Sequence, residues 1–279
     1  MSWEGLAGGG TTLSASPAES ARFGLTVERL TVGVAAPAGP GRAEDVAALL
    51  DASEADVVVV RLPADAADLA AAVATGPRTA LPAGTLVYWE HVAGRGAPGP
   101  AAREDVEVLA GSQLDPATAA DLPGTVEAVV TASFTGYGNH YSVDPLMPDD
   151  LALAGYVEWA QASVAQGGDD VHLLRHAGRV AGLATTSRGS APSTDGRPGE
   201  HLEILLAGLV PGSQGQGLYG HLLQGVLDRA VDAGLGRVVI STQAHNTRVQ
   251  RAWARAGFEP FAAVETVHCV APGLLPARR

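Results

Sequence analysis

A glycine-rich segment between an apolar run and an amphipathic segment constrains this chain more than any other feature. Residues 201–210 form an apolar run long enough for a central β-strand, and the segment 211–217 (PGSQGQG) follows directly. Residues 218–230 then carry leucine, valine and alanine at helical spacing, and Gly234 ends the pattern. A glycine turn that opens a helix presents backbone N–H groups at the positive end of the helix dipole. The sequence therefore predicts an anion site, suited to a diphosphate.

Two other nucleotide-binding patterns fit this segment poorly. A P-loop ends in Gly-Lys-Ser or Gly-Lys-Thr, and all 18 basic residues of this chain are arginines. Gly215, Gly217 and Gly220 do have the spacing of a dinucleotide-binding fingerprint. That fingerprint also needs an acidic residue at the end of the next strand, and the predicted strand 237–242 ends without one.

Residues 214–219 (QGQGLY) resemble the pyrophosphate loop of the GNAT superfamily of N-acetyltransferases, whose pattern is Arg/Gln-x-x-Gly-x-Gly/Ala. Residues 246–258 look like that family's second cofactor-contacting segment, with asparagine at the start and Gly-Phe at the end. The resemblance covers residues 126–270. It implies an α/β (α+β) GNAT fold, in which a mixed, mostly antiparallel sheet splays into a V between two parallel strands.

The resemblance also implies acetyl-CoA as the acyl donor and assigns its contacts. Backbone N–H groups of the loop would hold the pyrophosphate, while the preceding strand and the second segment would contact the pantetheine arm. The expected cofactor-binding residues are Leu209, Val210, Gln214, Gly215, Gln216, Gly217, Leu218, Tyr219, Asn246 and Trp253.

Two residues depart from the family pattern. Tyr219 stands where the family usually has glycine or alanine, so its side chain points away from the phosphates or reshapes the loop. Trp253 stands where many members have a tyrosine that protonates the leaving CoA thiolate. An indole N–H is not an acid at neutral pH, so the group that protonates the thiolate stays open, with His245 or water as candidates.

The N-terminal half carries a second resemblance. Residues 22–25, 57–60 and 85–89 look like the smaller N-terminal half-domain of amino-sugar N-acetyltransferases of the dTDP-fucosamine acetyltransferase type. The implied reaction is direct attack by the amine of a nucleotide-linked amino sugar on the acetyl thioester in a ternary complex. Such a reaction needs a group that takes the amine proton. The expected catalytic residues are Glu203, His140 and Tyr141, and the expected substrate-binding residues are Tyr137, His140, Tyr141 and Asp144.

Two alternative functions stay open. The unusual residues at 219 and 253 are compatible with a GNAT-fold enzyme that uses another acyl-CoA, either to transfer a longer acyl group or to decarboxylate a malonyl thioester. The missing tyrosine is also compatible with a module that binds CoA without turnover. His268 and Cys269, on the last predicted strand, are expected to be buried structural residues.

Breakers and periodicity divide the chain into three parts. We expect a flexible tail over 1–20, an α/β half-domain over 21–125 and a C-terminal acetyltransferase domain over 126–279. Within them, residues 23–30 predict a strand, Val126–Ala132 a connecting strand, and Ser187–Glu200 a polar surface loop that is also a candidate lid.

Composition limits the partners. The 279 residues carry a net charge of −12, and hydrophobic residues make up 46%, so the chain is globular and lacks a basic nucleic-acid footprint. The single cysteine excludes an internal disulfide framework and a cysteine-based metal cluster, and we expect no metal. The start lacks a signal-peptide pattern and no apolar run is long enough to span a membrane, so we expect a cytoplasmic protein with a small-molecule amine acceptor; a homodimer is compatible with the sequence.

The negative charge is unevenly distributed. Residues 1–130 hold 7 arginines and 17 acidic residues, a balance of 7 − 17 = −10. Residues 201–279 hold 7 arginines and 5 acidic residues, a balance of 7 − 5 = +2. The acidic total therefore does not oppose the binding of a polyanionic cofactor at the glycine loop.

Overall fold

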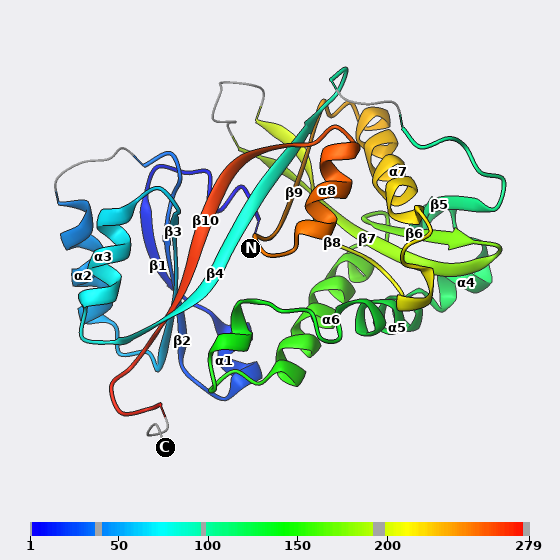
Figure 1. The fold of residues 1–279 in the computed structure, drawn as a ribbon. Coiled ribbons are helices and arrows are strands. Elements are labelled where there is room, and N and C mark those ends of the chain that lie inside the picture. The colour runs from blue at the N-terminus through cyan, green and yellow to red at the C-terminus, as the bar shows by residue number, and fades with distance from the viewer. Residues whose placement is uncertain (1, 37–40, 96–98, 192–198, 276–279) are drawn as a thin grey trace.

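One mixed β-sheet runs through both halves of the protein. The computed structural model describes residues 2–36, 41–95, 99–191 and 199–275, and these form a ten-stranded sheet in the order β1-β2-β3-β10-β4-β9-β8-β7-β6-β5 (Figure 1). Most neighbours are antiparallel; β2 with β3 and β8 with β9 are parallel. The strands are β1 (Thr11–Ala15), β2 (Val27–Val32), β3 (Val57–Pro63), β4 (Thr79–Val92), β5 (Val106–Ala110), β6 (Val171–His176), β7 (Arg179–Ser190), β8 (Glu200–Leu209), β9 (Arg237–Gln243) and β10 (Glu259–Val270).

Helices cover the sheet in three groups. The first group, α2 and α3, packs on β2, β3 and β10, while α7 and α8 pack on β8 and β9. The helices α5 and α6 pack on β6, β7 and β8, and α1 lies beside α6 (Figure 1). The helices are α1 (Pro17–Phe23), α2 (Arg42–Ala52), α3 (Ala67–Thr75), α4 (Pro116–Ala120), α5 (Leu122–Phe134), α6 (Asp149–Ala165), α7 (Leu218–Asp232) and α8 (Thr247–Arg255), with short 3₁₀ turns η1 (Gly111–Gln113), η2 (His140–Val143) and η3 (Pro211–Ser213).

The order of elements repeats within the sheet. A parallel strand pair with a helix between, then a helix and a further strand, occurs as β2-α2-β3-α3-β4 and again as β8-α7-β9-α8-β10. The last strand of each repeat pairs with the other repeat: β4 pairs with β9, and β10 pairs with β3. The two exchanged strands, β4 and β10, pair with each other at the centre. The halves therefore share one sheet through a strand exchange.

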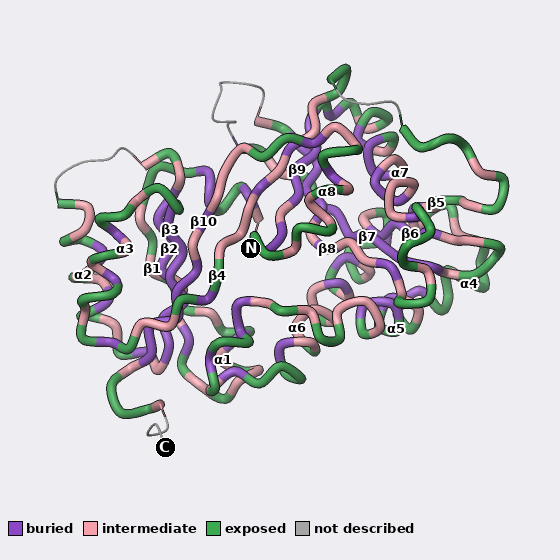
Figure 2. The backbone as a smooth tube through the Cα atoms, viewed as in Figure 1, coloured by how far each residue is buried: buried purple, intermediate pink, exposed green. Residues whose placement is uncertain are grey.

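Burial follows the sequence pattern along these strands. The run VVVVRLP of β3 is buried over its whole length, because helices cover one face and η2 and α6 the other. Figure 2 shows the buried residues gathered along the central strands. No helix among the described residues is long and apolar enough to cross a membrane.

The expected flexible tail over residues 1–20 is wrong for the described residues 2–20. Trp3 and Leu6 are fully buried, β1 pairs with β2, and α1 begins at Pro17. Trp3 packs against Tyr88 and Phe261, with ring centroids 5.1 and 4.7 Å apart. The many small residues of this segment let it lie flat across the sheet, while its two large apolar side chains anchor it.

Three further expectations are corrected. Val126–Ala132 lies within helix α5, because Val126, Val129 and Val130 recur at helical spacing and face β7 and β8. The expected strand over 23–30 begins only at Val27, since Phe23 ends helix α1. The boundary at residue 125 does not separate two sheets: β5 pairs with β6 of the C-terminal half, and β10 returns between β3 and β4.

The candidate lid Ser187–Glu200 falls partly on described strands. Residues up to Ser190 continue β7, and Glu200 begins β8. Residues 192–198 lie outside the described residues.

Candidate active site

The two parallel strands of the C-terminal half separate at a bulge. β8 and β9 pair only from Leu202–Ile204 to Val238–Ile240. Opposite β7, the register shifts between the partners of Ile204 and Leu206, which leaves Leu205 as an extra residue. A bulge bends its strand away from its neighbour. The expected V-shaped splay is therefore confirmed, and it opens beyond Ile204 and Ile240.

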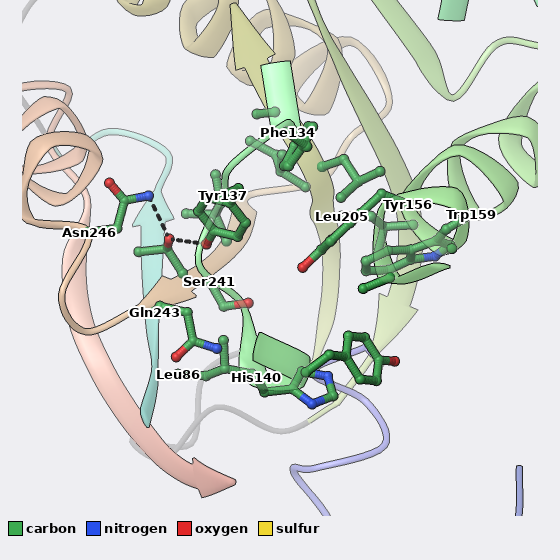
Figure 3. Close-up of a pocket in the computed structure, with 18 of the residues that line it drawn as sticks. Leu86, Phe134, Tyr137, His140, Tyr156, Trp159, Leu205, Ser241, Gln243 and Asn246 are labelled. Atoms are coloured by element: carbon green, nitrogen blue, oxygen red, sulfur yellow. Dashed lines mark hydrogen bonds between the residues drawn. The ribbon is translucent and has the colours of Figure 1, made fainter. Parts of the chain in front are cut away.

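A cavity of about 460 Å³ lies at this splay and extends toward the N-terminal half. Its walls come from both splayed strands, from α5, α6 and α8, and from α1 and β3. Figure 3 shows lining residues such as Phe134, Tyr137, Tyr156 and Asn246 around it. The side chains that line it include Glu19, Arg29, Arg61, Tyr88, Phe134, Tyr137, His140, Tyr141, Tyr156, Trp159, Leu205, Tyr219, Ser241, Thr242, Asn246 and Trp253.

The glycine loop lies at the start of α7, as expected. Gly215 and Gly217 have φ angles of 80° and 78°, a conformation that residues with a Cβ rarely adopt. Gly217 is the residue before the first turn of α7 and offers no side-chain cap, so the N–H groups of that turn face outward. The side chains of Gln214 and Gln216 donate to the carbonyl oxygens of Leu209 and Gly212, at 3.1 and 2.9 Å. These amides brace the loop, which leaves the backbone to bind an anion.

Two arginines that no motif singled out lie beside the loop. Arg248 donates to Oε1 of Gln214 at 3.1 Å, and Arg103 donates to the carbonyl oxygen of Gln216 at 3.4 Å. Asp105 holds Arg103 through two hydrogen bonds. Arg248 lies two residues after Asn246, so the second cofactor-contacting motif could have indicated it. Arg103 lies between β4 and β5, where the sequence shows no motif. Arg248 adds positive charge where a pyrophosphate would lie, whereas Asp105 offsets the charge of Arg103.

Asn246 takes part in a polar group at the mouth of the splay. Its side-chain amide donates to the Thr242 hydroxyl at 3.1 Å, and the hydroxyls of Tyr137 and Thr242 also lie 3.1 Å apart (Figure 3). The three side chains thus link the end of β9, the start of α8 and the segment after α5.

Tyr219 and Trp253, the two departures from the family pattern, contact each other. The indole Nε1 of Trp253 donates to the Tyr219 hydroxyl oxygen at 3.1 Å, and both side chains line the cavity. Tyr219 therefore turns away from the loop and toward the splay. Burial raises the pKa of Tyr219 to about 12, so its phenol is protonated at neutral pH. Because its oxygen already accepts from the indole, its own proton is available to another acceptor.

A buried chain of three side chains ends at the cavity. Nδ1 of His268 lies 3.0 Å from Oδ2 of Asp144, and Nε2 of His268 lies 2.9 Å from Nδ1 of His140. Asp144 and His268 are almost fully buried, while His140 lines the cavity. The expectation that His268 is merely structural therefore misses its contact with His140. Asp144 was expected to bind substrate; it lies outside the cavity lining and accepts from His268 instead.

Hydrogen bonding sets the tautomers of this chain. The Asp144 carboxylate can only accept, so Nδ1 of His268 carries a proton and its Nε2 accepts from Nδ1–H of His140. Nε2 of neutral His140 then carries a lone pair. Burial, followed by the nearby charge of Arg61, holds the pKa of His140 well below its usual value of 6.5. His140 is therefore a neutral base at physiological pH.

Glu19 gathers the polar groups at the other end of the cavity. Its carboxylate accepts from Arg29 Nε and Nη2 at 2.6 and 2.8 Å, from Ser16 at 2.6 Å and from the Tyr141 hydroxyl at 2.5 Å. Although burial opposes the charge, these donors lower the pKa of Glu19 to about 2. The Tyr141 hydroxyl, expected to be catalytic, is thus committed to Glu19, and burial beside that carboxylate raises its pKa.

The comparisons with known proteins agree with this geometry. Residues 139–258 match the model of the acetyltransferase (GNAT) family. This region is a GNAT acetyltransferase domain. The protein is accordingly an acyltransferase, and its acyl donor is acetyl-CoA. No curated protein sequence matches the chain.

Solved structures of the same fold cover nearly the whole chain. A GCN5-related N-acetyltransferase from Sphaerobacter thermophilus matches 96% of this chain and 79% of its own, with 14% identity and a TM-score of 0.61. A tandem GNAT protein from the clavulanic acid biosynthesis pathway matches 90% of this chain and 76% of its own, with 15% identity and a TM-score of 0.51. A glucosamine N-acetyltransferase region of a fungal multi-domain β-N-acetylglucosaminidase matches 92% of this chain and 31% of its own, with 12% identity and a TM-score of 0.53. At these identities the likeness concerns the fold.

The GNAT domain has the features that acetyl-CoA requires. The N-terminus of α7 and its two glycines offer backbone donors to a diphosphate, and the splay leads from there into the cavity. Tyr219, Asn246 and Trp253 line that cavity. The other expected cofactor-binding residues lie outside the cavity lining: Leu209, Val210 and residues 214–218. They form the end of β8 and the glycine loop, where the diphosphate end of the donor would lie.

Glu203 departs from its expected role in the GNAT domain. Its carboxylate lies outside the cavity lining and accepts from the backbone N–H of Trp3, at 3.0 and 2.8 Å to its two oxygens. The N-terminal segment thereby covers it, and burial raises its pKa to about 7. The sequence could not reveal this contact, because Trp3 and Glu203 are 200 positions apart.

Proposed function

We propose that this acyltransferase is an N-acetyltransferase that moves the acetyl group of acetyl-CoA to the amine of a small molecule, in a ternary complex. The observation that carries the proposal is a single cavity that joins the splayed strands to the His140 side chain. An acetyl donor entering through the splay and an amine bound against His140 would meet in that space.

His140 is the proposed general base. A protonated amine does not attack a thioester, so a neutral base must take the proton that the amine loses. Nε2 of His140 is the lone-pair nitrogen in the tautomer set by His268 and Asp144. When Nε2 gains a proton, Nδ1–H of His140 keeps its hydrogen bond, and the Asp144 charge stabilises the imidazolium through His268. Asp144 and His268 are thus positioning residues.

Tyr219 is the proposed acid for the departing thiolate. As the amine nitrogen forms its bond to the acetyl carbon and the C–S bond breaks, the sulfur takes up a negative charge. The Tyr219 O–H points to no acceptor among the described residues, and the Trp253 N–H stabilises the phenolate that forms when the proton leaves. The tyrosine that the resemblance placed at position 253 would thus be supplied from α7. Proton return from His140 to Tyr219 through water completes the cycle.

Amino sugars, including nucleotide-linked ones, are the proposed acceptor class. The resemblance of the N-terminal half to amino-sugar N-acetyltransferases supports this choice, and the fungal glucosamine N-acetyltransferase region shares the fold. The cavity also carries a cluster of aromatic rings; Phe134 and Tyr156 stack at 5.2 Å, with Tyr137 edge-on to both. Such rings offer flat apolar faces with polar tips, which suit a sugar ring. We further propose that the enzyme works in the cytoplasm.

An acceptor screen tests the proposal. Purified protein is incubated with acetyl-CoA and single amines drawn from amino-sugar nucleotides, free amino sugars, aminoglycosides and simple amines, and released thiol and acetylated product are both measured. We expect thiol release above hydrolysis with amino sugars, and about 10³-fold slower release with the His140→Ala variant. Thiol release that does not depend on any amine, or product formation only with acyl groups longer than acetyl, would contradict it.

A further inference from the structure

Arg61 is a buried arginine of the cavity wall that has no partner among the described residues. It lies on β3, on the face that carries Val57 and Val59 against Tyr141, and it lines the cavity. The residue is 5% exposed, and its Nε is buried without a hydrogen-bond partner. Among the described residues no carboxylate lies within 4.0 Å of its guanidinium. A charge that is both buried and unpaired strongly destabilises a fold, unless something outside the chain pairs with it.

The acids and bases around Arg61 do not neutralise it. Glu19 is the nearby carboxylate, and Arg29, Ser16 and Tyr141 already occupy its oxygens. His140 is neutral. Burial and the charge of Arg29 lower the pKa of Arg61, yet a guanidinium stays protonated at any physiological pH. The inner end of the cavity therefore carries one uncompensated positive charge.

A second polar group next to Arg61 also has no partner in the part of the chain that the structure describes. Thr266 on β10 is the cross-strand neighbour of Arg61, and its hydroxyl is buried without a hydrogen bond. By contrast Arg78, the other arginine buried near β3, donates to backbone carbonyl oxygens, among them those of Leu50 and Ala55. Backbone carbonyl oxygens thus accept the hydrogen bonds of Arg78, which has a structural role. Arg61, which lines the cavity, has no such acceptors among the described residues.

We infer that Arg61 binds an anionic group, a phosphate or a carboxylate, of the acceptor substrate. The inference rests on the proposed N-acetyltransferase function and narrows its substrate class to amines that carry such a group. The glycine loop and Arg61 belong to different halves of the chain, so the donor's diphosphate and the acceptor's anion have separate sites. A planar guanidinium pairs with two oxygens of either group at once.

Anion binding at Arg61 also affects the base. The charge of Arg61 is one of the causes that hold the pKa of His140 low. An anion paired with Arg61 offsets that charge, so His140 becomes a stronger base once the acceptor is bound. An acceptor that lacks the anionic group therefore binds more weakly and does not raise the basicity of His140.

Matched acceptors test the inference. Kinetics are measured with glucosamine 6-phosphate against glucosamine, and with an amino acid against its amide, for the wild-type protein and for Arg61→Gln and Arg61→Lys. Arg179→Gln, which removes an exposed arginine at the far end of β7, controls for loss of one charge. We expect Arg61→Gln to lower kcat/KM for the preferred anionic acceptor at least about 30-fold, as for one truncated partner of a buried charge pair. The neutral counterpart should change less than about 3-fold, the KM for acetyl-CoA should stay constant, and Arg61→Lys should retain part of the preference.

Other outcomes overturn the inference. Equal losses on charged and neutral acceptors assign Arg61 a general structural role, and a raised KM for acetyl-CoA assigns it to the donor. A thermal melt of Arg61→Met adds a readout independent of turnover: removal of an unpaired charge should raise Tm by about 2–4 °C, whereas loss of a structural contact lowers it.

If the wild-type protein acetylates no amine, the proposed function fails, and calorimetry with CoA present still decides the anion site. Binding of glucosamine 6-phosphate or the amino acid that is at least about 30-fold weaker in Arg61→Gln supports it; equal or absent binding contradicts it.

Discussion

The two repeats of this protein have the same order of elements and differ in how far their parallel strands stay paired. In the N-terminal repeat, β2 and β3 pair over Val27–Thr31 and Val57–Arg61. In the C-terminal repeat, β8 and β9 pair over Leu202–Ile204 only, and the bulge at Leu205 then separates them. One repeat therefore opens a cleft between its strands, while the other stays closed and contributes Arg29 and Arg61 to the wall of the cavity. The bulge at Leu205 in β8 therefore accounts for the main difference between the repeats, because it opens a cleft in one of them only.

The largest expected effect concerns the cavity that the opened repeat forms, which His140 lines. His140→Ala removes the proposed base and should lower kcat by about 10³-fold, within the range that general base catalysis contributes. The KM for acetyl-CoA should change little. In the wild-type protein the base must be neutral, and the pKa of free His140 lies well below 6.5. The acid limb of kcat/KM should therefore lie below pH 6.5, with a plateau above it. A kcat within about 3-fold of wild type would exclude His140 as the base.

The seam between the repeats is tested by Trp3→Ala. Trp3 is fully buried against Tyr88 of β4 and Phe261 of β10, the two exchanged strands. Loss of a buried tryptophan costs about 4 kcal/mol, measured by urea unfolding. Because the exchange joins the halves, we expect a single transition with a lower midpoint. Two separate transitions would show that the repeats unfold independently.

Glu203→Gln distinguishes a covered carboxylate from a catalytic one. The pKa of Glu203 is about 7 in the folded protein against 4.5 for an ordinary glutamate. A raised pKa contributes stability that is present below pH 4.5 and is lost as pH rises through 7. At pH 8 the free energy of unfolding of the wild type should be about 3 kcal/mol lower than under acid conditions, and the glutamine variant should not show this decrease. Urea unfolding of both proteins at pH 5 and pH 8 measures this difference. A kcat of Glu203→Gln that is reduced 10-fold or more at pH 8 would show that Glu203 takes part in catalysis.

Tyr219→Phe tests the proposed acid. Removal of the hydroxyl leaves the ring against Trp253 and should lower kcat by about 10²-fold. A thioester with a more acidic thiol leaving group should recover part of the rate, because it needs less protonation. Rates that fall equally for both donors would point to misplacement of CoA.

The smallest effect compares the two repeats at one matched position. Gly217 precedes α7 and Gly41 precedes α2, with φ angles of 78° and 95°. Alanine at either position costs about 1 kcal/mol of stability, because it strains a left-handed backbone. Only Gly217→Ala should raise the KM for acetyl-CoA, since only the open repeat binds it. Equal KM values for both variants would mean that the loop before α7 does not hold the donor.

The parts of the site that could be predicted from sequence are those encoded locally. The glycine loop, the strand before it and the Asn246 segment are contiguous motifs, and their residues are where the motifs put them. The Asp144–His268 contact joins positions 124 apart, and no spacing rule relates them. Val126–Ala132 was misjudged because β-branched residues favour strands, and only the packing of α5 on β7 and β8 overrides that preference. The first twenty residues were predicted to be flexible because most of them are small or polar, although Trp3 and Leu6 among them are fully buried.

The exchange of β4 and β10 has a consequence for how the chain reaches its native state. β10 is synthesised after the nine other described strands of the sheet, yet it lies between β3 and β4, near the middle of the sheet. Until it arrives, the N-terminal repeat exposes the open edge of β3, and neither half can be made separately without such an edge. Nascent chains of this protein therefore depend on contacts between distant parts of the sequence, which fold slowly and are prone to aggregate. Truncation within the last twenty residues should accordingly be more damaging than loss of a whole surface helix.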